Sequence, residues 1–259
     1  MTKTAGTLLA ASEPKPVTVY NPGATSQLVL VADHAGNLLP RALGRLGLSE
    51  SELERHIAWD IGIAEVGHLL ADALDAILIR QNYSRLVIDC NRPPGSPASV
   101  PEISELIAIP GNVGLSEAAK AEREHQIFRP YHRAIEQELD RQHHIGRPTA
   151  LIALHSFTPV FKGLARAMQA AVLYHRDPRL ARQLLVLLRQ EKDLIVGDNE
   201  PYFVSDTTDY TIPVHGERRG LPHVLVEIRQ DLIADEPGQR KWAALLAQLL
   251  PEAYRQSVA

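Results

Sequence analysis

Short apolar runs of strand length alternate with helical patterns along most of this chain. The strand-length runs occupy residues 28–32 (LVLVA), 76–80, 86–90, 150–154 (ALIAL), 170–174 and 224–228. Apolar residues recur at helical spacing over residues 49–74, 116–141, 178–190 and 238–254. Near-continuous apolar strands are buried on both faces, and the intervening helices cover those faces. The pattern therefore predicts an α/β fold of three layers, with a mostly parallel or mixed sheet between helices.

The remaining segments set the expected domain limits. Residues 1–25 are interrupted by prolines and show no period, so they are expected to form an N-terminal arm. Residues 26–259 are expected to form a single domain, since 259 residues suit one large core. The Pro- and Gly-rich segments 93–114 and 197–221 are too long for simple connections and are interpreted as functional loops. Pro130 is expected to kink or divide the helix over 116–141.

Composition excludes several classes of function. The formal net charge of −4 argues against a nucleic-acid partner. No apolar stretch approaches the roughly 20 residues of a membrane span, and no secretory signal is recognised, so a cytoplasmic protein is expected. The single cysteine, Cys90, lies in an apolar run and is interpreted as a core residue. There is no Gly-x-Ser-x-Gly elbow and no glycine-rich phosphate loop, which disfavours serine hydrolases and nucleotide enzymes.

Polar side chains come at or directly after the ends of four of the apolar runs. The four clusters are Asp33-His34, Asp89-Cys90-Asn91-Arg92, His155-Ser156 and Glu227-Ile228-Arg229. In open α/β sheets, ligands bind beyond the carboxyl ends of the strands. The sequence therefore predicts that these clusters meet at one rim and form an active site.

The two histidines suit a divalent metal. Neutral imidazole is a common zinc ligand, and a catalytic zinc site takes three protein ligands. Asp60, Asp33 and Glu227 are candidates for the third. The alternative is that His34 and His155 are only hydrogen-bonded at the strand ends.

Glu227 is interpreted as a general base. It lies among apolar residues of a strand, where burial raises a carboxyl pKa toward the range that such a base needs. The alternative is a buried ion pair with Arg229 or another arginine.

Arginine near the expected metal predicts an anionic substrate. Arg85, Asn91 and Arg92 bracket one apolar run, and a guanidinium matches a carboxylate in bidentate fashion. The alternative is a structural pair between Arg85 and Asp89. His56 and Asp60 are four residues apart, which on a helix is compatible with a metal pair or an ion pair.

Taken in order, these motifs resemble the N-formylglutamate amidohydrolase family, a distant relative of the zinc carboxypeptidases and aspartoacylase. The matching segments are Asp33-His34-Ala35-Gly36-Asn37, Trp59-Asp60-Ile61-Gly62, Ser84-Arg85-Leu86-Val87-Ile88-Asp89-Cys90-Asn91-Arg92, His155-Ser156-Phe157 and Glu227-Ile228-Arg229-Gln230-Asp231-Leu232. The resemblance covers residues 28–232 and implies a phosphorylase/hydrolase-like fold.

The resemblance also implies roles for particular residues. One zinc ion per chain is held by His34 and His155, Glu227 activates water, and Arg85 polarises the scissile carbonyl. The substrate's carboxylate is gripped by Asn91 and Arg92, with Ser156 and Arg229 as further expected substrate contacts. The carboxypeptidases carry a glutamate three residues after their first histidine, where this chain has Asn37. Asp60 is therefore expected as the third metal ligand, with Asn37 as the alternative.

The expected substrate is a small anionic N-acyl amino acid resembling N-formylglutamate, hydrolysed at its amide bond. Two other functions remain: a zinc carboxypeptidase acting on short peptides, and a non-catalytic protein that binds small anions.

Overall fold

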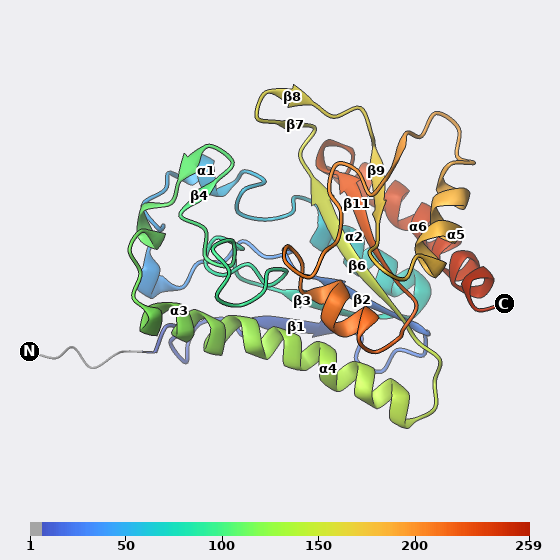
Figure 1. Cartoon of the computed structure of the whole chain (residues 1–259), viewed down its shortest axis with the longest axis horizontal. Coiled ribbons are helices and arrows are strands. Elements are labelled where there is room, and N and C mark those ends of the chain that lie inside the picture. Colours follow the sequence, from blue (N-terminus) through green and yellow to red (C-terminus); the bar gives the residue numbers. More distant parts are fainter. Residues whose placement is uncertain (1–6) are drawn as a thin grey trace, which may run out of the picture.

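The computed structural model describes residues 7–259 and shows a seven-stranded mixed sheet with helices on both faces (Figure 1). Residues 1–6 of the expected arm lie outside the described residues. The strand order is β1-β3-β2-β6-β11-β9-β10. The strands span β1 Val17–Tyr20, β2 Leu28–Ala32, β3 Ile77–Gln81, β6 Ala150–Phe157, β9 Ala170–Leu173, β10 Val196–Asp198 and β11 His223–Arg229. This confirms the expected three-layer α/β class.

The four central strands β3, β2, β6 and β11 are parallel, and antiparallel pairs join them on either side. β1 pairs antiparallel with β3, so part of the segment expected to be an arm belongs to the sheet. β9 pairs antiparallel with β11, and β10 runs parallel to β9. The carboxyl ends of β2, β6 and β11 therefore meet at one edge.

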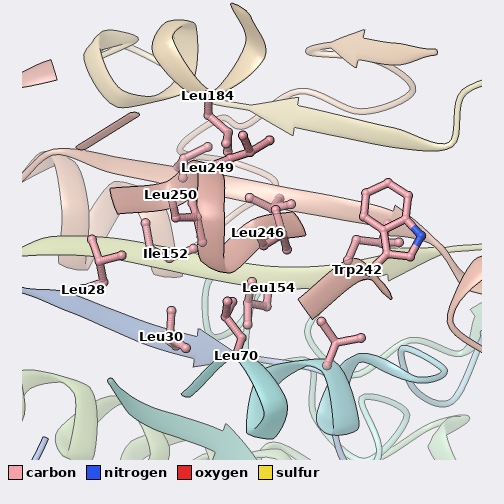
Figure 2. Packing of buried hydrophobic residues seen from close by; sticks show 14 of the residues in the cluster. Leu28, Leu30, Leu70, Ile152, Leu154, Leu184, Trp242, Leu246, Leu249 and Leu250 are labelled. Atoms are coloured by element: carbon pink, nitrogen blue, oxygen red, sulfur yellow. The ribbon is translucent and has the colours of Figure 1, made fainter. Parts of the chain in front are cut away.

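One helical layer consists of α2 (Ile63–Leu74), α5 (Arg179–Leu188) and α6 (Glu236–Ser257). Its core residues form one cluster with side chains from one face of the sheet, and Figure 2 shows Leu70, Leu184 and Leu246 in this cluster together with Leu30 and Leu154. Because successive strand residues face opposite sides, Leu28 and Leu30 enter this core and their neighbours in β2 enter the other.

The second layer lies across the opposite face of the sheet (Figure 1). It consists of α3 (Glu117–Arg123), a π-helical turn (Glu124–Phe128) and α4 (Arg129–His144). Pro130 falls in the first turn of α4, where its missing N–H costs least, which confirms the expected division of this helix.

Small elements complete the chain: α1 Glu50–Leu53, the hairpins β4 Ile103–Ser104 with β5 Ile107–Ala108 and β7 Val160–Phe161 with β8 Leu164–Ala165, and short helical turns at Arg41–Leu43, Pro110–Asn112, Ile212–Glu217 and Gln230–Leu232.

The structure corrects the helix expected over residues 49–74. α1 ends at Leu53 and α2 begins at Ile63, with turns between them. Gly62 has φ 79°, which a right-handed helix cannot include, and a Cβ there would lie 2.1 Å from the carbonyl oxygen of Ile233. His56 and Asp60 therefore do not share a helix face.

The apolar run 86–90 is likewise not a strand. Its amide hydrogens bond locally or to another loop, as from Val87 to Ser84 and from Asp89 to Ser99. The run is apolar because it is buried in the second core, where the Arg123 guanidinium donates to the Val87 carbonyl. Among residues 7–259, no helix combines the length and apolarity that crossing a bilayer requires.

The α6 core makes a test of this packing. Leu246 is fully buried, so we expect Leu246→Ala to lower the free energy of unfolding by about 2–5 kcal/mol. Val186→Ala, at an exposed position of α5, should change it by less than about 0.5 kcal/mol. Equal effects in urea denaturation would contradict the packing described.

Candidate active site

A pocket of about 1100 Å³ opens at the carboxyl ends of β2, β6 and β11. Ten of the candidate residues named from the sequence line it: His34, His56, Asp60, Arg85, Asp89, Asn91, Arg92, His155, Ser156 and Glu227. Both long polar segments contribute walls, through residues 94–105 and 201–209. The polar clusters thus meet at one rim, although the cluster 89–92 follows a buried loop instead of a strand.

Three side chains form a compact group of metal-ligand type. One ligand atom from each of His34, Asp60 and His155 lies within 4.8 Å of the others, and all three residues are buried. Asp60 Oδ2 is 3.5 Å from His34 Nδ1 and 3.0 Å from His155 Nδ1. The two imidazole rings meet edge to face with centroids 4.8 Å apart.

Each histidine is held from behind by a carboxylate. His34 Nε2 lies 2.7 Å from Asp89 Oδ1, and His155 Nε2 lies 3.1 Å from Asp33 Oδ2. A carboxylate accepts a hydrogen bond, so each Nε2 carries a proton and each Nδ1 faces Asp60. Carboxylate support of this kind is the usual arrangement behind metal-binding histidines.

The donor set fits a divalent metal. His34 Nδ1 is buried and has no hydrogen-bond partner in the described part of the chain, although Asp60 lies just beyond bonding distance. Two imidazole nitrogens and one carboxylate oxygen are the ligands of many catalytic zinc sites. A cation there would also offset the negative charge of the surrounding carboxylates.

Local backbone geometry brings Asp60 to His34. The Asp60 amide donates to the His34 carbonyl at 2.9 Å, and the Ser156 amide donates to Asp60 Oδ2 at 3.1 Å. Gly36 is required beside His34, because a Cβ there would lie 2.1 Å from the carbonyl of Asn82 in the next loop.

Electrostatics keeps the three aspartates ionised. Burial alone would raise the pKa of Asp33, but the hydrogen bond and charge of His155 outweigh it and hold that pKa at about 2. The pKa of Asp60 is lowered in the same way, against its own burial, by both histidines. Arg85 and His34 lower the pKa of Asp89 well below its usual range despite burial. For His155, burial opposes the charge, yet Asp33 and Asp60 raise its pKa well above the usual value.

The pKa of Glu227 is raised, whereas those of the three aspartates are lowered. Glu227 is paired in register with His155 across the parallel strands β11 and β6, so the two residues lie side by side. Burial raises its pKa to about 7, although the charge of His155 partly opposes this. Its Oε2 is buried and has no hydrogen-bond partner among the described residues. The alternative ion pair with Arg229 is not formed, since that guanidinium bonds to Asp231 instead.

Arg85 lines the pocket and also forms the ion pair with Asp89 that the sequence offers as its alternative role. Its Nε and Nη2 donate to Asp89 Oδ2 at 3.0 and 2.6 Å, while Nη1 lies 3.7 Å from Asp60 Oδ1. Asp89 therefore fixes His34 and Arg85 together, one through each oxygen.

Arg92 and Asn91 anchor the 205–211 loop. The Arg92 guanidinium donates to the Thr208 carbonyl and, at 3.1 Å, to the Asn91 carbonyl. The Asn91 side chain donates to Asp209 at 3.0 Å and accepts from the backbone of Tyr210 and Thr211.

The remaining expected site residues lie differently. The Ser156 hydroxyl donates to the Ile61 carbonyl at 2.9 Å, beside Asp60. Arg229 is not among the pocket-lining residues and donates to the carbonyls of residues 166–168. Asn37 is not among the pocket-lining residues, and its amide nitrogen donates to the Leu53 carbonyl at 2.8 Å.

Several site residues were not given their roles by sequence reasoning. From the sequence, Asp89 is considered only as the ion-pair partner of Arg85, and Asp33 only as a possible third metal ligand. Both come directly after apolar residues. His56 and Tyr202 line the pocket, and burial lowers the pKa of His56 and raises that of Tyr202. The sequence marks His56 only as a possible partner of Asp60 on a helix, and Tyr202 only as part of the long polar segment 197–221, because only the folded loops bring both residues to the rim.

Known proteins resemble this chain in sequence and in fold. In solved structures, a gene product of Agrobacterium tumefaciens is 37% identical, with 97% of this chain and 100% of that chain covered and a TM-score of 0.94. An N-formylglutamate amidohydrolase from Ralstonia eutropha JMP134 shares the fold at 19% identity, with 94% of this chain and 98% of that chain covered and a TM-score of 0.68. No curated protein sequence matches. The model of one family matches residues 26–234, which confirms the resemblance seen in the motifs: the chain belongs to the N-formylglutamate amidohydrolase family.

Proposed function

We propose that the protein hydrolyses the amide bond of an N-acyl acidic amino acid resembling N-formylglutamate, releasing the acid and the free amino acid in a zinc-dependent reaction. The observation that carries the proposal is the unpartnered, buried Oε2 of Glu227 beside two histidines that turn Nδ1 toward Asp60. Membership of the family supports the reaction type.

His34, Asp60 and His155 would hold the metal, one ion per chain. The chemistry that zinc supplies in such a site is Lewis acidity, which polarises an amide carbonyl and lowers the pKa of water. The chain's own part is to aim both Nδ1 atoms at one point, where a metal would take the place of the proton between His155 Nδ1 and Asp60. Asp89 and Asp33 do this by accepting the Nε2 protons of the two histidines.

Glu227 acts as the base that takes a proton from water and returns it to the leaving amine. A base works best when its pKa lies near the working pH, and burial brings that of Glu227 to about 7. Arg85 supports the negative charge that develops on the amide oxygen, because Asp89 fixes its guanidinium at the pocket wall.

Arg92 is the proposed grip for the substrate carboxylate. It lines the pocket, and only its Nη1 makes a hydrogen bond in the described part of the chain. Nε and Nη2 remain free for the bidentate contact that a carboxylate prefers.

The size of the pocket favours short peptides as a second substrate class. A cavity of about 150 Å³ holds benzene, so a formylated amino acid of twice as many atoms needs roughly 300 Å³. The pocket of about 1100 Å³ leaves room for a longer acyl group or a peptide. Assays of N-formyl-L-glutamate beside a short peptide with a free carboxyl end decide between the two classes. Binding of glutamate without turnover of either substrate, in metal-replete protein, would favour the anion binder instead.

Replacement of the base tests the reaction. We expect Glu227→Gln to lower kcat on N-formyl-L-glutamate by about 100-fold or more, because the proton acceptor is lost. The variant should still contain one zinc per chain by elemental analysis, since Glu227 is not among the proposed ligands. Turnover close to wild type would refute the role of Glu227.

The same substitution has a pH-dependent effect on stability in metal-free protein. The folded pKa of about 7 exceeds the ordinary 4.5, so the wild type loses stability as pH rises through this interval. Glu227→Gln lacks that loss, and we expect it to be more stable than wild type at pH 8 by up to about 3 kcal/mol, with no such gain at pH 4. The exposed Glu54→Gln is the control. A gain of equal size at both pH values would contradict a raised pKa.

The carboxylate grip is tested by Arg92→Met. Losing a charged hydrogen-bond pair should raise KM for N-formyl-L-glutamate roughly 10-fold or more. Arg229→Met removes an arginine that does not line the pocket and should leave KM unchanged. If both variants behave alike, Arg92 does not bind the carboxylate.

A further inference from the structure

A chain of hydrogen bonds connects the 205–211 loop to His155. Thr211 is fully buried, and its hydroxyl donates to Asp33 Oδ1 at 2.6 Å. The other oxygen of Asp33, Oδ2, lies 3.1 Å from His155 Nε2. Asp33 is itself buried, and these are the two side-chain hydrogen bonds that its carboxylate makes among the described residues; the buried Tyr131 hydroxyl lies near it as well.

The loop end that carries Thr211 is held by Asn91. Its side-chain oxygen accepts from the amides of Tyr210 and Thr211 at 3.0 and 3.1 Å, and its nitrogen donates to Asp209 Oδ1 at 3.0 Å. Asp209 Oδ2 in turn accepts from the Ser205 amide at 3.1 Å. The side-chain oxygen of Asn91 is thus occupied in fastening the loop.

Thr211 does not line the pocket, so it cannot contact a substrate there. Its hydroxyl instead occupies one oxygen of Asp33 and leaves the other for the His155 ring. Without that donor, a buried carboxylate oxygen loses its partner, which is costly, and the carboxylate is free to turn away from His155.

We propose that Thr211 is a positioning residue for the metal site, acting on His155 through Asp33, and that Asn91 holds the loop that carries it. The inference rests on the proposed metal-dependent function, because it gives His155 the role of a ligand. The same loop contacts the Arg92 guanidinium through the Thr208 carbonyl. One loop therefore supports both the proposed metal ligand and the proposed carboxylate grip.

The test compares zinc affinity among variants that differ in one hydroxyl. Thr211→Val keeps the shape of the side chain and removes the donor, whereas Thr211→Ser keeps the donor. Zinc binding is measured by competition with a chromophoric chelator, on the metal-free full-length protein. We expect Thr211→Val to weaken zinc binding roughly 10-fold, the low end of the effect of residues that support metal ligands, and Thr211→Ser to restore most of it.

Thr207→Val is the matched control. Thr207 is an exposed residue of the same loop, and its hydroxyl forms a hydrogen bond with the Ser205 hydroxyl. This variant should bind zinc as the wild type does. If Thr211→Val does not fold, Thr211→Ala compared with Thr211→Ser gives the same contrast of one hydroxyl.

Wild-type zinc affinity in Thr211→Val would overturn the proposal. Equal weakening in Thr211→Val and Thr211→Ser would overturn it too, because packing and not the hydroxyl would then matter. Weakening confined to the variants without the hydroxyl supports it, even if the wild type hydrolyses no N-acyl amino acid. That last outcome would reject the proposed substrate and leave the positioning role intact.

Discussion

Burial of four carboxylates in one small space is the constraint on which the rest of the site depends. Asp33, Asp60, Asp89 and Glu227 are all at least nine-tenths buried, and unpaired charges are very costly away from water. Arg85 and His155 offset part of this charge, and burial partly neutralises Glu227 by raising its pKa. A divalent cation beside His34 Nδ1 would complete the balance.

The fold makes this assembly by simple means. Parallel β6 and β11 place His155 and Glu227 in register, and the end of neighbouring β2 delivers Asp33 and His34. Loops complete the site through contacts between residues far apart in the sequence, such as the hydrogen bond from Thr211 to Asp33. The helical layers on both faces keep the strand ends fixed, so the histidines and their carboxylates form a preorganised site.

Sequence reasoning predicted β2, β3, β6, β9 and β11 and the polar residues near their ends, because apolar runs of strand length and the polar clusters after them are local signals. It missed the edge strands β1 and β10 and took the buried loop 86–90 for a strand. It failed where a long-range contact overrides the local pattern. The sequence pattern places Asp60 on a continuous helix, whereas the first helix ends at Leu53, the left-handed Gly62 precedes the next one, and the Asp60 amide bonds to His34. The partner of His34 is Asp89, 55 positions away, and no spacing rule predicts that pair. Arg229 lies two residues after Glu227 in the central strand β11, yet its side chain donates to the 166–168 carbonyls.

The central claim is that one metal ion lies where both histidines turn their Nδ1 atoms toward Asp60. Anomalous diffraction at the zinc absorption edge, from crystals grown with zinc, tests this most directly. We expect a single strong peak in contact with Nδ1 of His34, Nδ1 of His155 and a carboxylate oxygen of Asp60. A peak bound through Nε2 of either histidine, or no peak in this pocket, would contradict it.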